Sequence, residues 1–120
     1  LASGAPARDV VYVPRPKPGE VPASEFKALA AAVPADTVLL DVRNADEVAA
    51  GAFAGATNIP ADQVASRAAE LPRDKRIVTH CSTGLRAEMA YNVLRAAGFP
   101  RVAFFAKSVE FDAGKAEIGE

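Results

Sequence analysis

The sequence predicts an α/β fold in which a central, mostly parallel sheet is flanked by helices. Short apolar runs alternate with amphipathic stretches, as expected when parallel strands are joined by crossover helices. The chain has 120 residues, a length that suits one domain with a core of its own. Apolar residues make up 50% of the chain and charged residues 24%, as in ordinary globular proteins.

The first 22 residues differ in composition from the rest. Residues 10–13 form a short apolar run that predicts a strand. The following stretch is rich in proline, which cannot donate a hydrogen bond inside a sheet, so we expect a stiff, extended connector there. We therefore divide the chain into an N-terminal strand with a proline-rich connector, residues 1–22, and a main domain, residues 23–120.

The first part of the main domain predicts two helices around a buried strand. Ser24 is a good N-cap, and Pro34 ends the helix that follows it. Residues 37–40 are a continuous apolar run of the kind found in buried parallel strands. Asn44 can cap a short helix that Gly51 terminates.

The second part repeats the alternation of strands and helices. A short strand at 57–59 precedes a predicted helix over 61–71, and a second apolar strand follows at 76–80. A longer helix is predicted over 85–97, with Gly98 as its stop. The positions that fall on neighbouring turns of this helix are Leu85, Met89, Asn92 or Val93, and Ala96.

The chain ends in a strand and a hairpin. Residues 102–105 are apolar and predict the last strand of the sheet. Residues 109–118 predict a C-terminal hairpin that turns at Ala113 and Gly114.

The stretch His-Cys-Ser-Thr-Gly-Leu-Arg at 80–86 holds the only histidine and the only cysteine of the chain. It lies between a predicted strand and a predicted helix, where backbone N–H groups converge and the helix N-terminus adds partial positive charge. A thiol at such a junction is expected to ionise easily, and the loop amides can hold an anion. We interpret Cys81 as a nucleophile at the floor of a small anion pocket.

Polar residues near the strand ends are the remaining site candidates. Asp41 and Cys81 each follow a strand, so we expect them to share a crevice at the carboxyl edge of the sheet. Arg43 and Glu47 are four residues apart and can form an ion pair. Strand alternation directs His80 away from Cys81, which favours a packed core histidine over a general base.

Two separated segments resemble the rhodanese-like domain family. The resemblance covers about residues 24–105 and implies a compact three-layer α/β domain with a central parallel sheet. The family's usual chemistry is sulfur transfer, in which the loop cysteine takes a sulfane sulfur as a persulfide and passes it to a thiophilic acceptor. The matching residues are Leu40-Asp41-Val42-Arg43, Glu47, Gly51, Gly55-Ala56 and Asn58-Ile59-Pro60 in the first segment, and Cys81-Ser82-Thr83-Gly84-Leu85-Arg86 in the second.

The resemblance implies a thiosulfate sulfurtransferase that needs no metal and no cofactor. Cys81 is then catalytic, and Asp41 and Arg43 support the site. Arg86 is expected to hold the sulfonate oxygens of thiosulfate or to stabilise the persulfide. The hydroxyls of the next two loop residues either donate to the sulfur or are simply solvated, and both readings stay open. The substrate-binding residues implied are Ser82, Thr83, Gly84, Leu85 and Arg86.

Two other functions compete with this one. Phosphatases with a related loop carry five residues between cysteine and arginine, whereas four lie between Cys81 and Arg86, so a phosphatase or arsenate reductase is disfavoured. A persulfide-carrying or persulfide-sensing module that serves a partner protein remains open. The expected partners are a small sulfur donor, a thiol or cyanide acceptor and, in the second case, an acceptor protein.

The chain departs from the family pattern at three places. Ala52 stands where the family often has histidine. The segment 105–108 replaces the usual Gly-Gly after the last strand, and the predicted hairpin replaces the closing helix. We expect these changes to alter the substrate entrance or a partner surface, not the loop chemistry.

Charge and composition bound the location and partners of the protein. The net charge of −1 argues against binding to nucleic acid, and no apolar run reaches the roughly 18 residues of a membrane span. One cysteine excludes an internal disulfide and a cysteine-rich metal cluster. The chain begins at Leu1, which fits a cleaved export signal or an excerpt of a longer protein, so a periplasmic and a cytoplasmic location both stay open.

Overall fold

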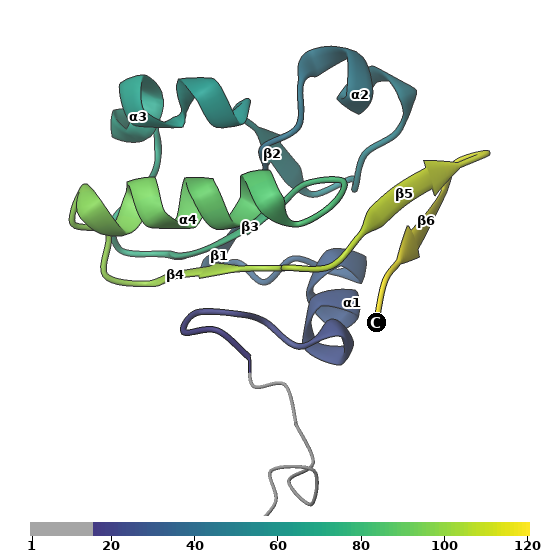
Figure 1. Ribbon diagram of the computed structural model, residues 1–120, viewed down its shortest axis with the longest axis horizontal. Coiled ribbons are helices and arrows are strands. Elements are labelled where there is room, and N and C mark those ends of the chain that lie inside the picture. The colour runs from purple at the N-terminus through teal and green to yellow at the C-terminus, as the bar shows by residue number, and fades with distance from the viewer. Residues whose placement is uncertain (1–15) are drawn as a thin grey trace, which may run out of the picture.

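A four-stranded parallel sheet between two layers of helices forms the centre of the protein, as the computed structural model of residues 16–120 shows (Figure 1). The strand order is β2-β1-β3-β4, and every neighbouring pair is parallel. The predicted α/β class and parallel sheet are therefore confirmed, whereas the strand predicted at 10–13 lies outside the described residues. The strands are β1 (Thr37–Asp41), β2 (Ala56–Asn58), β3 (Arg76–His80) and β4 (Val102–Phe104).

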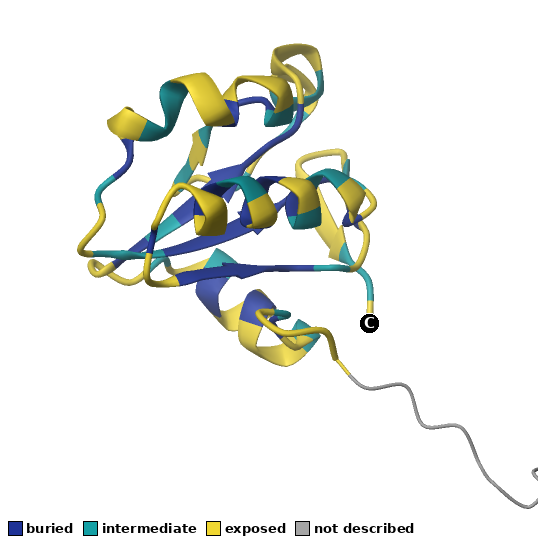
Figure 2. Ribbon diagram, turned by 60° about the vertical axis from the view of Figure 1, so that its left-hand side comes forward, coloured by how far each residue is buried: buried dark blue, intermediate teal, exposed yellow. Residues whose placement is uncertain are grey.

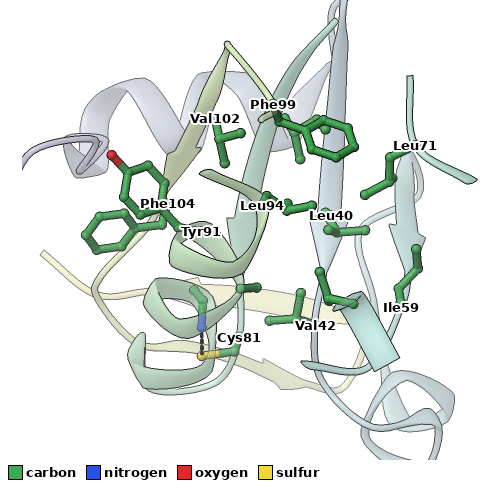
Figure 3. Packing of buried hydrophobic residues seen from close by; sticks show 14 residues of the cluster. Leu40, Val42, Ile59, Leu71, Cys81, Tyr91, Leu94, Phe99, Val102 and Phe104 are labelled. Atoms are coloured by element: carbon green, nitrogen blue, oxygen red, sulfur yellow. Dashed lines mark hydrogen bonds between the residues drawn. The ribbon is translucent and has the colours of Figure 1, made fainter. Parts of the chain in front are cut away.

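The helices bury apolar residues against both faces of this sheet (Figures 1 and 2). On one face, α4 packs with the segment before β3 over a cluster that includes Leu40, Leu94 and Cys81 (Figure 3). On the other face, α1 places Phe26 in a stack with Phe105, with ring centroids 4.1 Å apart. The helices are α1 (Ala23–Ala31), α2 (Ala45–Ala50), η2 (Ala61–Gln63), α3 (Val64–Arg67), η3 (Ala68–Glu70) and α4 (Leu85–Ala96).

The described part of the proline-rich connector lies along the open edge of β4. The Val21 N–H donates to the carbonyl of Phe104, and the Phe104 N–H donates to the carbonyl of Gly19, both at 2.9 Å. The connector therefore meets the sheet at its edge and not in its interior, in line with its proline content.

Capping rules predicted both ends of α2, at Asn44 and Gly51, and the end of α4 correctly, but the start of α1 wrongly. The α1 helix is capped by Pro22 and not by Ser24, because the Phe26 N–H donates to the Pro22 carbonyl and this register buries Phe26 completely. Asn44 caps α2 as predicted, and its N–H donates to Glu47 Oε1 at 2.9 Å. Gly98, with φ of 92°, ends α4.

The single helix predicted over 61–71 is wrong, because this segment consists of three short turns. Gln63 and Arg67, with φ of −109° and −111°, depart from helical dihedral angles. Val64 and Leu71 are nevertheless both buried in the same core cluster.

The apolar positions expected on α4 do not form its buried face. Leu85 is 67% exposed and Met89 54% exposed, whereas the core contacts come from Ala87, Ala90, Tyr91 and Leu94. Small residues allow the helix to approach β3, where Thr79 Oγ1 donates to the Ala87 carbonyl at 2.7 Å. Helical periodicity alone could not show that the face with Ala87 and Ala90, and not the face with Leu85 and Met89, packs on the sheet.

The C-terminal hairpin is confirmed and packs beside the loop that follows β3. It consists of β5 (Val109–Asp112) and β6 (Lys115–Ile118), and Ala113 and Gly114 turn the chain with φ of 51° and 80°. The N–H of Val109 donates to the Ser82 carbonyl at 3.0 Å. Across residues 16–120, none of the helices combines the length and apolarity that crossing a bilayer requires.

Candidate active site

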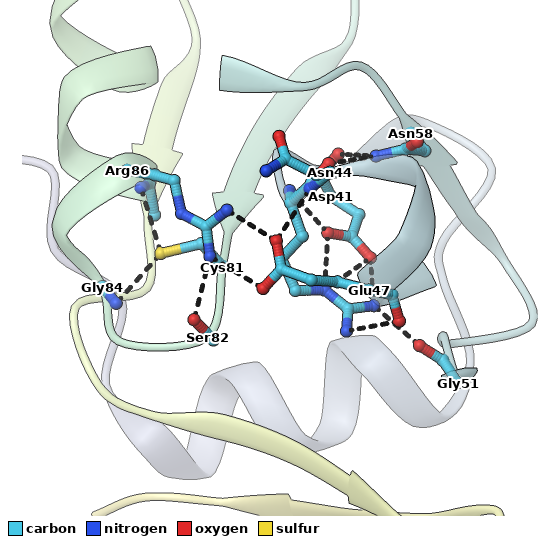
Figure 4. A network of polar contacts seen from close by, with 11 residues as sticks. Asp41, Asn44, Glu47, Gly51, Asn58, Cys81, Ser82, Gly84 and Arg86 are labelled. Atoms are coloured by element: carbon cyan, nitrogen blue, oxygen red, sulfur yellow. Dashed lines mark hydrogen bonds and ion pairs between the residues drawn. The ribbon is translucent and has the colours of Figure 1, made fainter. Parts of the chain in front are cut away.

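Cys81 lies at the carboxyl end of β3, and its sulfur faces the N-terminus of α4 (Figure 4). Two backbone N–H groups point at Sγ, that of Gly84 at 3.0 Å and that of Ala87 at 3.4 Å. Ala87 is the third residue of α4, so its N–H has no partner within the helix, and Gly84 has no side chain to cap it. The sulfur therefore takes the place of a capping side chain.

Gly84 is required by the shape of the loop. Its φ is +100°, and a Cβ there would lie 2.0 Å from the carbonyl oxygen of Ala106. Ala106 belongs to the segment that replaces the family's Gly-Gly, so this segment fixes the loop from outside. Gly84 thus combines a positive φ with a close approach of backbone, and both conditions favour glycine.

In the described part of the chain, the hydrogen bonds to the sulfur come from backbone N–H groups and not from the two hydroxyls of the loop. Ser82 Oγ accepts a hydrogen bond from Arg86 Nη2 at 2.9 Å, and Thr83 is exposed. The Ala87 N–H, which sequence reasoning missed, is the second donor instead. The absence of a capping side chain at position 84 was the signal that could have revealed it.

Arg86 forms a two-pronged ion pair with Glu47 across the mouth of the loop (Figure 4). Its Nη1 and Nη2 lie 2.7 and 3.0 Å from the two carboxylate oxygens of Glu47. Hydrogen bonds from Arg86 lower the pKa of Glu47 to about 2, and those bonds in turn raise the pKa of Arg86. The ion pair expected between Arg43 and Glu47 is therefore wrong, because the Glu47 carboxylate binds an arginine 39 residues away.

Arg43 instead pairs with Asp41 in the interior. Arg43 Nε and Nη2 donate to the two oxygens of Asp41 at 2.9 and 2.6 Å, and Nη2 also donates to the Gly51 carbonyl. The guanidinium lies 4.8 Å from the centre of the Phe111 ring, on the hairpin. This pair joins β1, α2 and β5 and has its hydrogen bonds satisfied.

His80 lies on the opposite side of β3 from Cys81, as strand alternation predicts. Its ring packs against Phe26 and Phe53, with centroids 5.6 and 5.2 Å away. Burial lowers the pKa of His80 to about 4. Its Nε2 is 3.7 Å from Asp41, beyond hydrogen-bond distance, and Arg43 already balances the Asp41 charge, so the histidine is neutral at pH 7.

This placement also corrects the expected crevice. Asp41 faces His80, on the side of the sheet covered by α1, whereas Cys81 packs with the α4 cluster. The strands that carry them are paired, with Asp41 opposite His80, and a chain of polar contacts runs from Arg43 Nη1 to the Glu47 carbonyl and from the Glu47 carboxylate to Arg86.

The Cys81 side chain is closed off from solvent by the residues packed around it. Cys81 is fully buried. A surface hollow of about 350 Å³ lies along α4 and is lined by residues outside the loop, among them Lys17, Glu88 and Tyr91. A substrate reaches the sulfur only if atoms that cover it move.

Residues 22–110 match the family model described as the rhodanese-like domain, so the chain belongs to the rhodanese-like domain family. A curated sulfurtransferase from Allochromatium vinosum is 33% identical over 67 residues, which cover 56% of this chain and 63% of the relative. A tRNA uridine(34) hydroxylase from Cronobacter sakazakii is 38% identical over 76 residues, covering 56% of this chain and 21% of that protein. The chain thus spans less than two thirds of these relatives.

Solved structures show the same fold. The human single-domain sulfurtransferase TSTD1 is 27% identical with a TM-score of 0.63, covering 75% of this chain and 90% of the human one. The reduced CoADR-RHD of Bacillus anthracis is 29% identical with a TM-score of 0.64, covering 74% of this chain and 15% of the other. The chain therefore resembles single-domain proteins as well as a domain within a much longer chain.

Proposed function

We propose that this domain is a sulfurtransferase that moves a sulfane sulfur from thiosulfate or a similar donor through a persulfide on Cys81. The observation that carries the proposal is the pair of backbone N–H groups aimed at Sγ from the N-terminus of α4. These donors favour negative charge on sulfur before and after the transfer. Membership of the rhodanese-like family and the similarity to sulfurtransferases support it.

The first step is attack of the Cys81 thiolate on the outer sulfur of thiosulfate. A sulfur–sulfur bond forms to Cys81, the sulfur–sulfur bond of thiosulfate breaks, and sulfite leaves with the electron pair. The protein is left as a persulfide anion, whose terminal sulfur takes up the charge. Four residues between Cys81 and Arg86 make a ring that suits one added sulfur atom. The loop from Ser82 to Arg86 provides the amides and the guanidinium around it.

The second step returns the thiolate. Cyanide or a thiol attacks the terminal sulfur, and the sulfur–sulfur bond of the persulfide breaks. The Cys81 thiolate is regenerated on the protein, and thiocyanate or an organic persulfide is released. Because donor and acceptor react in turn with one residue, the kinetics are expected to be ping-pong.

Replacement of the cysteine tests this function directly. Cys81→Ser is expected to lose all measurable thiosulfate:cyanide transfer, because a serine hydroxyl does not form the persulfide. Circular dichroism and the melting temperature check that the variant is folded. Full turnover by folded Cys81→Ser contradicts the proposal.

One observation favours a second candidate, a persulfide carrier that serves a partner protein. Cys81 is fully buried, while Leu85 and Met89 are exposed on α4, the helix that follows the loop. A carrier accepts sulfur once but returns it to cyanide slowly. Rapid single loading by thiosulfate with little steady-state turnover supports the carrier, and multiple turnovers support the enzyme.

A further inference from the structure

The Arg86 guanidinium is already occupied by a carboxylate. Both Nη atoms bind Glu47, at 2.7 and 3.0 Å, and Nη2 also donates to Ser82 Oγ. A sulfonate group is recognised by arginine through the same two-pronged geometry. A donor such as thiosulfate must therefore compete with Glu47 for the cation that is expected to bind it.

Glu47 is anchored beside Arg86 by the start of α2, although part of its side chain reaches solvent. It is the third residue of α2, and its Oε1 accepts the Asn44 N–H at 2.9 Å in a capping arrangement. The hydrogen bonds from Arg86 lower the pKa of Glu47 to about 2, so the carboxylate is ionised at any working pH. An arriving dianion meets this negative charge as well as the loss of the Arg86 contact.

We propose that Glu47 is a positioning residue that sets donor specificity by holding Arg86 away from sulfonate groups. Resting on the function proposed above, this favours donors without an anionic head group, such as an organic persulfide with an uncharged substituent. In that reaction the Cys81 thiolate attacks the outer sulfur of R–S–SH, the donor's sulfur–sulfur bond breaks, and the thiolate RS⁻ leaves. Atoms and charge balance without any further reactant.

The geometry also distinguishes this role from a merely structural one. The ion pair joins α2 to α4 at the surface, with side-chain exposures of 31% for Glu47 and 28% for Arg86, so its loss is tolerated by the fold. If the ion pair is only structural, its removal changes the KM for all donors alike. If Glu47 sets specificity, its removal changes the KM only for donors that bind Arg86.

The test compares Glu47→Gln with a matched variant, Glu88→Gln. Glutamine keeps the acceptor for Asn44 but loses the charge. Glu88 is on α4, pairs with Lys17 at 3.0 Å and does not contact Arg86, so its replacement removes an equal charge near the site. For Glu47→Gln we expect the KM for thiosulfate to fall about three- to tenfold with kcat nearly unchanged. The KM for 2-hydroxyethyl persulfide should not move, and Glu88→Gln should alter neither.

A binding measurement separates this inference from the proposed function. In the Cys81→Ser background no transfer is needed, and Glu47→Gln should tighten thiosulfate binding by the same factor in calorimetry. Unchanged or weaker thiosulfate binding, or an equal change for both donors, overturns the role of Glu47. A wild-type protein that never forms a persulfide, yet whose Glu47→Gln change tightens binding, would overturn the proposed function alone.

Discussion

Two arginine–carboxylate pairs lie side by side in this domain, and they differ in how far they are buried and therefore in how readily their partners can be replaced. Asp41 and Arg43 have side-chain exposures of 1% and 5%, whereas Glu47 and Arg86 have 31% and 28%. Both pairs are two-pronged and have similar distances. The comparison shows that the same chemical pair is a fixed support in the interior and an exchangeable contact at the mouth of a site.

Neighbouring contacts explain the difference. Arg43 also binds the Gly51 carbonyl and lies over Phe111, while the Asp41 carboxylate accepts the Arg43 N–H. Removing either partner leaves an uncompensated charge in the interior. Water or a substrate anion can replace either partner of the Glu47–Arg86 pair, because both side chains reach solvent.

The largest expected effect comes from breaking the buried pair. Arg43→Ala leaves the Asp41 carboxylate buried without its partner and is expected to lower the free energy of unfolding by about 3–5 kcal/mol. Arg86→Ala is the matched control, with an expected loss of about 1 kcal/mol or less. Urea unfolding of both variants measures the difference. Equal losses would show that burial does not separate the two pairs.

As the pH falls, we expect protonation of His80 in the interior to lower the free energy of unfolding before Glu47 of the Glu47–Arg86 pair is protonated. The folded-state pKa of His80, about 4, is below its ordinary value of 6.5 because of burial, so the unfolded chain binds the proton more readily. Stability is then complete above pH 6.5 and declines as pH falls toward 4, by roughly 2–3 kcal/mol between pH 7.5 and 4.5. Glu47, with a pKa of about 2 against an ordinary 4.5, loses its contribution only below that window.

Urea unfolding at the two pH values checks this dependence. His80→Phe is the control, because phenylalanine fits the aromatic contacts with Phe26 and Phe53 and cannot titrate. The variant should lose most of the decline. An unchanged decline would assign the effect to other groups.

A smaller effect is expected from the loop that carries Arg86. Gly84→Ala combines a φ of +100° with a clash against the Ala106 carbonyl, and should cost about 2 kcal/mol and reduce persulfide formation. Gly114→Ala, at φ of +80° with nothing within 4 Å of a Cβ, should cost about 1 kcal/mol and leave transfer unchanged. Urea unfolding and sulfur-transfer assays of both variants test whether the loop that carries Arg86 must keep this backbone conformation.

Local rules predicted the frame of the site from the sequence. The order of strand, loop and helix around Cys81, the cap at Asn44, the stop at Gly98 and the turn at Gly114 depend on neighbours in the chain. These features need only short-range backbone chemistry, so one sequence was enough to identify them.

Contacts between distant segments could not be predicted in the same way. The spacing of Arg43 and Glu47 suggested a pair, but the partner of Glu47 is Arg86, which only the sheet brings near. The buried face of α4 depends on how close Ala87 and Ala90 approach β3, which periodicity does not specify. The crevice shared by Asp41 and Cys81 was wrong because the carboxylate of Asp41 turns to the other face of the sheet.

The central claim is that Cys81 carries the transferred sulfur, and intact-protein mass spectrometry tests it most directly. After exposure to thiosulfate, the wild-type protein should gain the mass of one sulfur atom, and cyanide should remove it. Peptide mapping should place the gain on Cys81, the only cysteine of the chain, and Cys81→Ser should show none. A folded protein that remains unmodified, or a gain that persists in Cys81→Ser, would contradict the account.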